Sequence, residues 1–125
     1  MNVGATDIYV ASLLANLFEA GASIQVLFGD MDRAQYEASR LTRPEIERLL
    51  RLMIDTVVAL PDSVRERMPE VDWQSWEELG AHLPPRSLAD RALVWSALSA
   101  WLAPTGSALR RYRRQLPALW QVRFM

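Results

Sequence analysis

The clearest structural signal in the chain lies in residues 42–61, which read TRPEIERLLRLMIDTVVALP. Apolar side chains recur there every three or four positions, the spacing of one helix face. They are Ile46, Leu49, Leu50, Met53, Val57 and Leu60. Thr42 and Glu45 have the spacing of a capping box, and Pro44 suits a first helical turn because its missing N–H is not needed there. Pro61 cannot continue the helix, so we expect the helix to end before it.

The segment upstream predicts a second long helix with its own apolar face. That face comprises Val10, Leu13, Leu14, Leu17, Gly21, Ile24 and Phe28. Thr6 or Asp7 is a suitable N-cap, and Gly29 marks the end of the helix. Asp30 is then expected to cap a shorter helix that runs to about Ser39.

Downstream, shorter apolar stripes separated by prolines predict further helices. Asp72 caps one of them, and Ser87 opens another, with Asp90 in the place of the usual capping-box glutamate. Pro104-Thr105-Gly106 is expected to close that helix, and a final helix follows that Pro117 allows to bend. No segment alternates with a period of two, so no strand is expected. Residues 1–125 are therefore predicted to form a single all-α domain, an up-and-down bundle of four to five helices.

The composition excludes several classes of function. Half of the 125 residues are apolar and 23% are charged, a balance typical of soluble globular domains. The absence of cysteine excludes disulfides and thiolate metal sites, and a single histidine, His82, excludes a multi-histidine metal site. The scattered glycines form no phosphate-binding loop, so neither a metal nor a cofactor is expected. Glu78 and His82, four residues apart, are expected to form a solvent-facing pair at a helix end.

The first apolar segment, Ile8–Phe28, raises the question of a membrane span. Asn16, Glu19 and Gln25 lie within it, and each would be costly at the centre of a bilayer. A secretory signal begins with basic residues, whereas the only charge ahead of this segment is Asp7. We therefore expect a cytoplasmic protein that makes no membrane contact.

Charge is distributed very unevenly along the chain. Residues 1–90 contain all fifteen acidic residues and eight arginines, a balance of −7, while residues 91–125 contain six arginines and no acid. Four of those six are Arg110, Arg111, Arg113 and Arg114, which spread around most of a helix, so some must face solvent or a partner. Three interpretations are open: pairing with the acidic surface of residues 30–78 within or between subunits, docking of an acidic partner, and contact with RNA phosphates. The net charge of −1 argues against strong non-specific binding of nucleic acid.

Tryptophan is unusually frequent, with five in the chain. Trp73 and Trp76 share one helix face, and packing in the core or at an interface is the expected role, with stacking on a nucleobase as the alternative. If the helix is regular, the side chains of Trp95 and Trp101 project from it in very different directions. We therefore expect one of them to lie in a contact between subunits.

Several local strings occur in an order that matches a known family. They begin with Asp7-Ile8, Phe28-Gly29-Asp30 and Ala59-Leu60-Pro61, and continue with VRERMPEVDW at residues 64–73 and QLPAL at residues 115–119. In these strings the chain resembles the HepT-like branch of the HEPN proteins, small helical bundles encoded beside minimal nucleotidyltransferases. The resemblance covers about residues 7–73 and 107–120. It implies a HEPN-like homodimer, a nucleotidyltransferase partner and a bacterial toxin–antitoxin-like system.

The resemblance fails where ribonuclease members of the family carry their active site. Those members have Arg-Asn followed by a histidine about five residues after the arginine, and the two subunits together use them to polarise the phosphate and transfer protons. The best counterpart here is Arg91, but Ala92 replaces the asparagine and Ser96 stands where the histidine should be. Serine exchanges no proton near pH 7, so metal-free cleavage loses its main acid and base.

The resemblance thus implies a non-catalytic binding or regulatory component, without catalytic residues. Arg91 is left as a phosphate-contacting or structural arginine, and a weak contact with RNA stays open. The contact surface would consist of Arg110, Arg111, Arg113 and Arg114. Two alternatives remain: a HEPN-type ribonuclease that uses His82 in an atypical site, and a stand-alone helical interaction or structural module.

Overall fold

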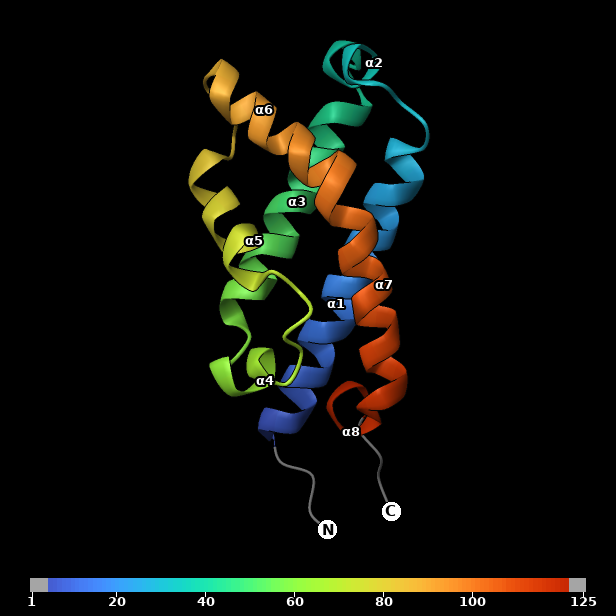
Figure 1. The fold of residues 1–125 in the computed structure, drawn as a ribbon, viewed down its shortest axis with the longest axis vertical. Helices are drawn as coiled ribbons and strands as arrows, with labels where there is room; N and C mark the ends of the chain where they lie inside the picture. The colour runs from blue at the N-terminus through green and yellow to red at the C-terminus, as the bar shows by residue number, and fades with distance from the viewer. Residues whose placement is uncertain (1–4, 122–125) are drawn as a thin grey trace.

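The computed structural model describes residues 5–121, and over them the chain is helical without any strand, as predicted (Figure 1). The helices are α1 (Ala5–Phe28), α2 (Arg33–Ala38), α3 (Thr42–Ala59), α4 (Asp62–Glu66), α5 (Trp73–Leu79), α6 (Leu88–Ser96), α7 (Leu102–Gln115) and α8 (Pro117–Trp120). A 3-10 turn, η1 (Gly80–His82), extends α5, and a π-helical turn, η2 (Ala97–Trp101), joins α6 to α7. In Figure 1, α1 ascends, α3 descends beside it, and the α6–η2–α7 segment descends in front of both.

α1 and α3 form the centre of the molecule and bury the two stripes that the sequence predicts. α1 packs mainly along α3 and also contacts α7 and α8. α5 packs against α3. The buried side chains of the two central helices include Val10, Leu13, Leu14, Leu17, Ile24, Ile46, Leu50, Met53 and Val57. They belong to one contiguous core cluster with residues of α5 and α7.

α1 also has the length and apolar character of a membrane-crossing helix. The stretch Thr6–Phe28 of α1 has a mean hydropathy of 1.4. Of the most apolar segment within this stretch, 28% is buried inside the bundle. A core helix of a soluble protein and a signal sequence have these same properties.

Three predicted helix caps are wrong. Thr6 and Asp7 cap no helix because both lie inside α1, whose first described residue is Ala5. The other two are wrong because the helix begins at a different residue from the one expected. α2 is capped by Asp32 rather than Asp30: Asp32 Oδ1 accepts from the Gln35 amide at 2.8 Å, and Gln35 Oε1 accepts from the Asp32 amide at 2.9 Å. Thr42 is already the first residue of α3, so its amide donates to Ser39 Oγ at 3.0 Å instead of Thr42 acting as the cap. Glu45 is then free to bind Arg48.

The largest difference from the sequence prediction is that no helix ends at Pro104-Thr105-Gly106. α6, η2 and α7 are consecutive, and Pro104 falls in the first turn of α7. In η2 the Leu102 amide donates to the Ala97 carbonyl, five residues earlier. A π turn is wider than an α turn, which relieves the contact that a proline ring otherwise makes with the carbonyl four residues before it.

The same π turn corrects the expectation for the tryptophans. Because η2 changes the angular relation between the residues before and after it, Trp95 and Trp101 both pack against the core of their own chain. Trp95 contacts the ring of Phe28, with centroids 5.4 Å apart, and Trp101 stands edge-on to Trp76 at 5.6 Å. No contact between subunits is needed to account for either side chain.

Candidate functional site

Arg91, the predicted counterpart of the family's catalytic arginine, lines a small polar pocket between α2, α3 and α6. The pocket has a volume of about 40 Å³, room for about one water molecule. Its other lining residues are Tyr36, Glu37, Arg43, Glu47, Pro85 and Val94. Arg43 and Glu47 lie one turn apart on α3 and form an ion pair, with 3.5 Å between Nη1 and Oε2.

Two polar atoms at this pocket are buried without a partner, the Tyr36 hydroxyl and Arg43 Nε. Burial raises the pKa of Tyr36 well above its ordinary value, and the charge of Glu47 adds to the effect. Burial also raises the pKa of Glu47. The positive charges of Arg43 and Arg91 lower that pKa, and the negative charge of Glu37 raises it further. The phenol therefore stays neutral, and a water molecule in the pocket could satisfy both unpartnered atoms.

Sequence reasoning identified only Arg91 in this pocket. Tyr36, Arg43 and Glu47 were missed because they come from α2 and α3, more than forty residues before Arg91. The one available signal was the four-residue spacing of Arg43 and Glu47, which also fits an ordinary surface pair.

His82 is held by Asp90 rather than by Glu78. His82 donates from Nδ1 to Asp90 Oδ1 at 2.7 Å, while Glu78 accepts from Gln74 Nε2 at 2.9 Å, so the predicted Glu78–His82 pair is wrong. Asp90 Oδ2 also accepts from the Arg86 amide at 2.9 Å. The Arg86 amide, followed by the His82 hydrogen bond, holds the pKa of Asp90 below its ordinary value. His82 is not among the residues that line the Arg91 pocket.

The arginine cluster of α7 divides into two pairs. Arg111 forms an ion pair with Glu70, and the guanidinium of Arg113 lies 4.6 Å from the centroid of the Phe18 ring in α1. Arg110 and Arg114 are exposed and have no carboxylate partner among residues 5–121. The predicted pairing with the acidic region of residues 30–78 thus occurs within the chain at Arg111, whereas Arg110 and Arg114 face solvent.

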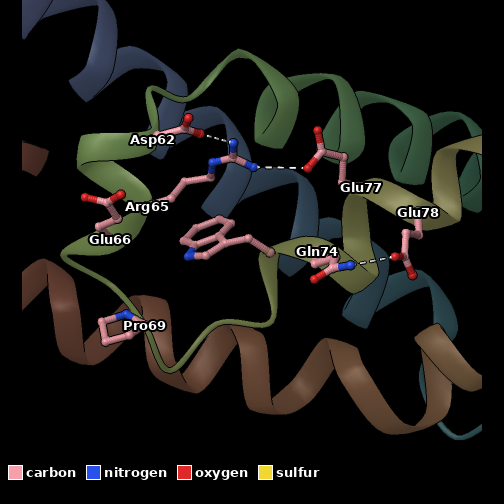
Figure 2. A pocket seen from close by; sticks show the side chains of 8 residues that line it. Asp62, Arg65, Glu66, Pro69, Gln74, Glu77 and Glu78 are labelled. Carbon is pink, nitrogen blue, oxygen red and sulfur yellow. Dashed lines mark hydrogen bonds and ion pairs between the residues drawn. The ribbon is translucent and has the colours of Figure 1, made fainter.

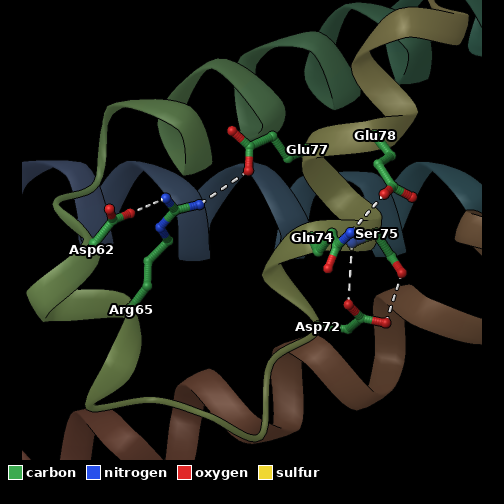
Figure 3. Close-up of polar contacts among 7 residues, drawn as sticks. All are labelled: Asp62, Arg65, Asp72, Gln74, Ser75, Glu77 and Glu78. Carbon is green, nitrogen blue, oxygen red and sulfur yellow. Dashed lines mark hydrogen bonds and ion pairs between the residues drawn. The ribbon is translucent and has the colours of Figure 1, made fainter.

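An acidic groove lies between α4 and α5, and sequence reasoning did not identify it. Figure 2 shows its lining: Asp62, Arg65, Glu66, Pro69, Trp73, Gln74, Glu77 and Glu78. The groove is open and has a volume of about 770 Å³. Arg65 binds both Asp62 and Glu77, and so joins the two helices across the groove (Figure 3). The Glu77 contact measures 3.3 Å.

The local structure around the groove follows from a cap and a short loop. Asp72 accepts from the Ser75 amide at 3.1 Å and starts α5, as predicted, and Figure 3 shows the second contact, from the Ser75 hydroxyl to Asp72 Oδ2 at 2.6 Å. Trp73 Nε1 donates to the Met68 carbonyl at 2.9 Å, which fixes the loop between α4 and α5. Within the described part of the chain, no group of three or more histidine, aspartate and glutamate side chains is arranged to hold a metal ion.

Comparisons with protein-family models, with curated proteins and with solved structures find no match to this chain. The geometry of these surfaces is therefore the basis of the functional argument.

Proposed function

We propose that this protein is a non-catalytic member of the HepT-like branch of the HEPN proteins, built as their up-and-down helical bundle. In this proposal it acts in the cytoplasm as a homodimer without membrane contact. It binds a minimal nucleotidyltransferase as the regulatory component of a toxin–antitoxin-like system.

The observation that supports the absence of catalysis is that His82 is hydrogen-bonded to Asp90 and is not among the residues that line the Arg91 pocket. Metal-free RNA cleavage in this family needs a histidine and an arginine at one site, because one group transfers protons while the other polarises the phosphate. Here His82 Nδ1 is committed to Asp90 at 2.7 Å, and Arg91 lines a pocket without His82. The same pocket holds Glu37 and Glu47 beside Arg43 and Arg91, so its charges balance and offer a phosphate no net attraction.

The surfaces favour a protein partner over RNA. Arg110 and Arg114 could contact phosphates, which is the argument for the RNA alternative. However, Arg111, which lies between these two arginines on α7, is paired with Glu70, and Pro69, the residue before Glu70, lines the acidic groove. A phosphate backbone that follows α7 would therefore meet carboxylates within a few residues, whereas a folded protein can match both signs of charge.

The absence of catalysis is tested by incubating the purified protein with single-stranded and structured RNA. We expect no cleavage above the level of an Arg91→Ala variant, because the Arg91 pocket is lined by no histidine that could transfer protons. Cleavage that disappears in both Arg91→Ala and His82→Ala would overturn the proposal in favour of the atypical ribonuclease.

The regulatory part is tested separately, by co-expression with a minimal nucleotidyltransferase encoded beside the gene. A complex of defined stoichiometry on size-exclusion chromatography supports it. Separate elution of the two proteins would contradict it and favour the stand-alone module.

A further inference from the structure

Tyr36 anchors the short helix α2 to the rest of the bundle. α2 packs on α3 at one end of the molecule, and Tyr36 is the buried residue of this helix (Figure 1). The Tyr36 ring contacts the rings of Phe28 and Trp95, whose centroids lie 6.4 Å and 6.1 Å from its own. Only 3% of Tyr36 is exposed, so the ring cannot turn toward solvent without leaving the core. Apolar packing therefore fixes the place of its hydroxyl.

That hydroxyl lies at the Arg91 pocket, where two buried polar atoms need a hydrogen-bond partner. Neither the Tyr36 hydroxyl nor Arg43 Nε has one among the described residues, and the two atoms do not bind each other. An unbonded polar atom in the interior lowers stability, because it has lost its hydrogen bonds to water. The N–H group of Arg43 Nε can only donate, whereas a phenol can both donate and accept. The pocket therefore calls for an occupant that accepts from Arg43 and also binds the phenol.

The charge and the size of the pocket identify that occupant. Two carboxylates, Glu37 and Glu47, and two guanidinium groups, Arg43 and Arg91, line the pocket, so no net charge is left to hold an ion. The volume of about 40 Å³ accommodates one water molecule, whose share of the liquid is about 30 Å³, and excludes larger ligands. Water both accepts and donates, which suits the donor-only Nε of Arg43 and the phenol together.

Glu47 supplies a further partner for this water molecule. It lies one turn after Arg43 on α3, and its Oε2 is 3.5 Å from Arg43 Nη1. The Glu47 carboxylate thus borders the same pocket as Arg43 Nε and the Tyr36 hydroxyl, and it can accept from the water. Buried water molecules in proteins typically make about three hydrogen bonds, and these three groups supply that number.

We propose that the pocket binds one ordered water molecule, which accepts from Arg43 Nε, hydrogen-bonds to the Tyr36 hydroxyl and donates to Glu47. Tyr36 belongs to α2 and the other two residues belong to α3, so the water molecule fastens the short helix to the bundle. The water site is independent of the proposed function, because it concerns how the chain holds α2 and not what the chain binds.

A high-resolution crystal structure of the full chain tests the site directly. We expect one density peak at hydrogen-bond distance, about 2.7–3.2 Å, from both the Tyr36 hydroxyl and Arg43 Nε. A pocket without density, or one in which these two atoms bind protein atoms directly, would overturn the proposal. Crystals grown with bromide in place of chloride distinguish an anion from water, since an anomalous peak in the pocket would identify an anion and also overturn it.

Tyr36→Phe tests in solution whether the hydroxyl is hydrogen-bonded. We expect this substitution to lower the melting temperature by about 2–6 °C, because it removes one hydrogen bond and leaves the water molecule with a partner fewer. A dry pocket gives the opposite sign, since the substitution then removes a buried hydroxyl that binds nothing.

The other two described tyrosines provide matched controls. Tyr112 is buried, and its hydroxyl accepts directly from the Glu70 amide at 3.0 Å, so Tyr112→Phe should lower the melting temperature by a similar amount. Tyr9 is 54% exposed, so Tyr9→Phe should leave the melting temperature unchanged to within about 1 °C.

The sign of the Tyr36→Phe shift decides the outcome in solution. A decrease like that of Tyr112→Phe supports the water site, and a melting temperature equal to or above that of the wild type would overturn it. The crystal structure requires no substitution, so it decides the question even for a Tyr36→Phe variant that does not fold. Neither result changes the tests of ribonuclease activity and of complex formation.

Discussion

Asp90 makes contacts that its predicted role did not include. As a capping-box residue it was expected to accept from the amide of the cap, Ser87. Its own amide does donate to Ser87 Oγ at 3.0 Å, but its carboxylate accepts from the Arg86 amide and from His82 instead. One side chain thus ties the end of η1 to the start of α6 across the loop between them.

These contacts predict how the stability of the protein depends on pH. The hydrogen bonds lower the folded-state pKa of Asp90, so its contribution to folding is complete above the ordinary aspartate pKa of about 3.9 and is lost as the pH falls through the folded-state value. Asp90→Asn should therefore melt at a lower temperature than the wild type at neutral pH, and the difference should narrow below a pH of about 4. Melting curves followed by circular dichroism test this, and a difference that stays constant down to strong acid would contradict it.

At the scale of helices, residue spacing predicted which faces are buried but not how the helices are joined. The α1 and α3 stripes were correct because burial of an apolar face is a property that recurs along the whole helix. The continuity of α6 with α7 was missed because it depends on the single turn η2, which places Pro104 where a proline is tolerated.

The candidate site was predictable to the same limited extent. The arginines of α7 are adjacent in sequence, so their surface could be predicted from local charge. The groove could not be predicted, because the chain has to fold back from α4 to α5 before Asp62 and Glu77 become neighbours. In the sequence, the spacing of Asp62 and Arg65 indicates only an ordinary ion pair within one helix.

The junction of α5 with η1 gives a stability prediction at this scale. A Cβ at Gly80 would lie 2.8 Å from Arg51 Nη2, the end of a side chain that can swing aside, and 3.0 Å from Cγ2 of Ile54, which is buried and cannot; both residues are on α3. Gly80→Ala should therefore push the α5–η1 junction away from α3 and lower the free energy of unfolding by about 1–3 kcal/mol. Urea denaturation measures the change.

Gly106 provides the matched control for that substitution. A Cβ there would meet its nearest neighbour, Gln25 Oε1, at 3.7 Å, an ordinary contact, and the residue lies inside α7. Gly106→Ala should therefore raise the free energy of unfolding by about 0.4–1 kcal/mol, since alanine restricts the unfolded chain more than glycine. Equal effects of the two substitutions would contradict the close packing assigned to Gly80.

At the scale of the whole molecule, the chain is nearly neutral because two strongly charged portions cancel. Residues 1–90 carry −7, and the six arginines of residues 91–125 oppose them. The fold pairs only part of this charge internally: among the described contacts, Arg111 binds Glu70 across the two portions, while Arg110 and Arg114 are exposed and have no carboxylate partner. Opposite charges that stay unpaired within one subunit can form ion pairs between two subunits.

Salt separates a charged contact between two copies of the chain from an apolar one. A homodimer held by opposite charges should weaken by about tenfold or more between about 0.05 M and about 0.5 M NaCl, because the screening length shortens to a few ångströms over that range. The alternative contact surface is the exposed apolar patch where Val26 is 82% exposed and Leu27 lies beside it, near Leu49 of α3. Burial of such a patch does not depend on attraction between charges, so its dimer would hold or tighten as salt is added. Sedimentation equilibrium across the salt series therefore distinguishes the two kinds of contact without any substitution, and a Kd that does not rise with salt would contradict the charged contact and favour the apolar patch.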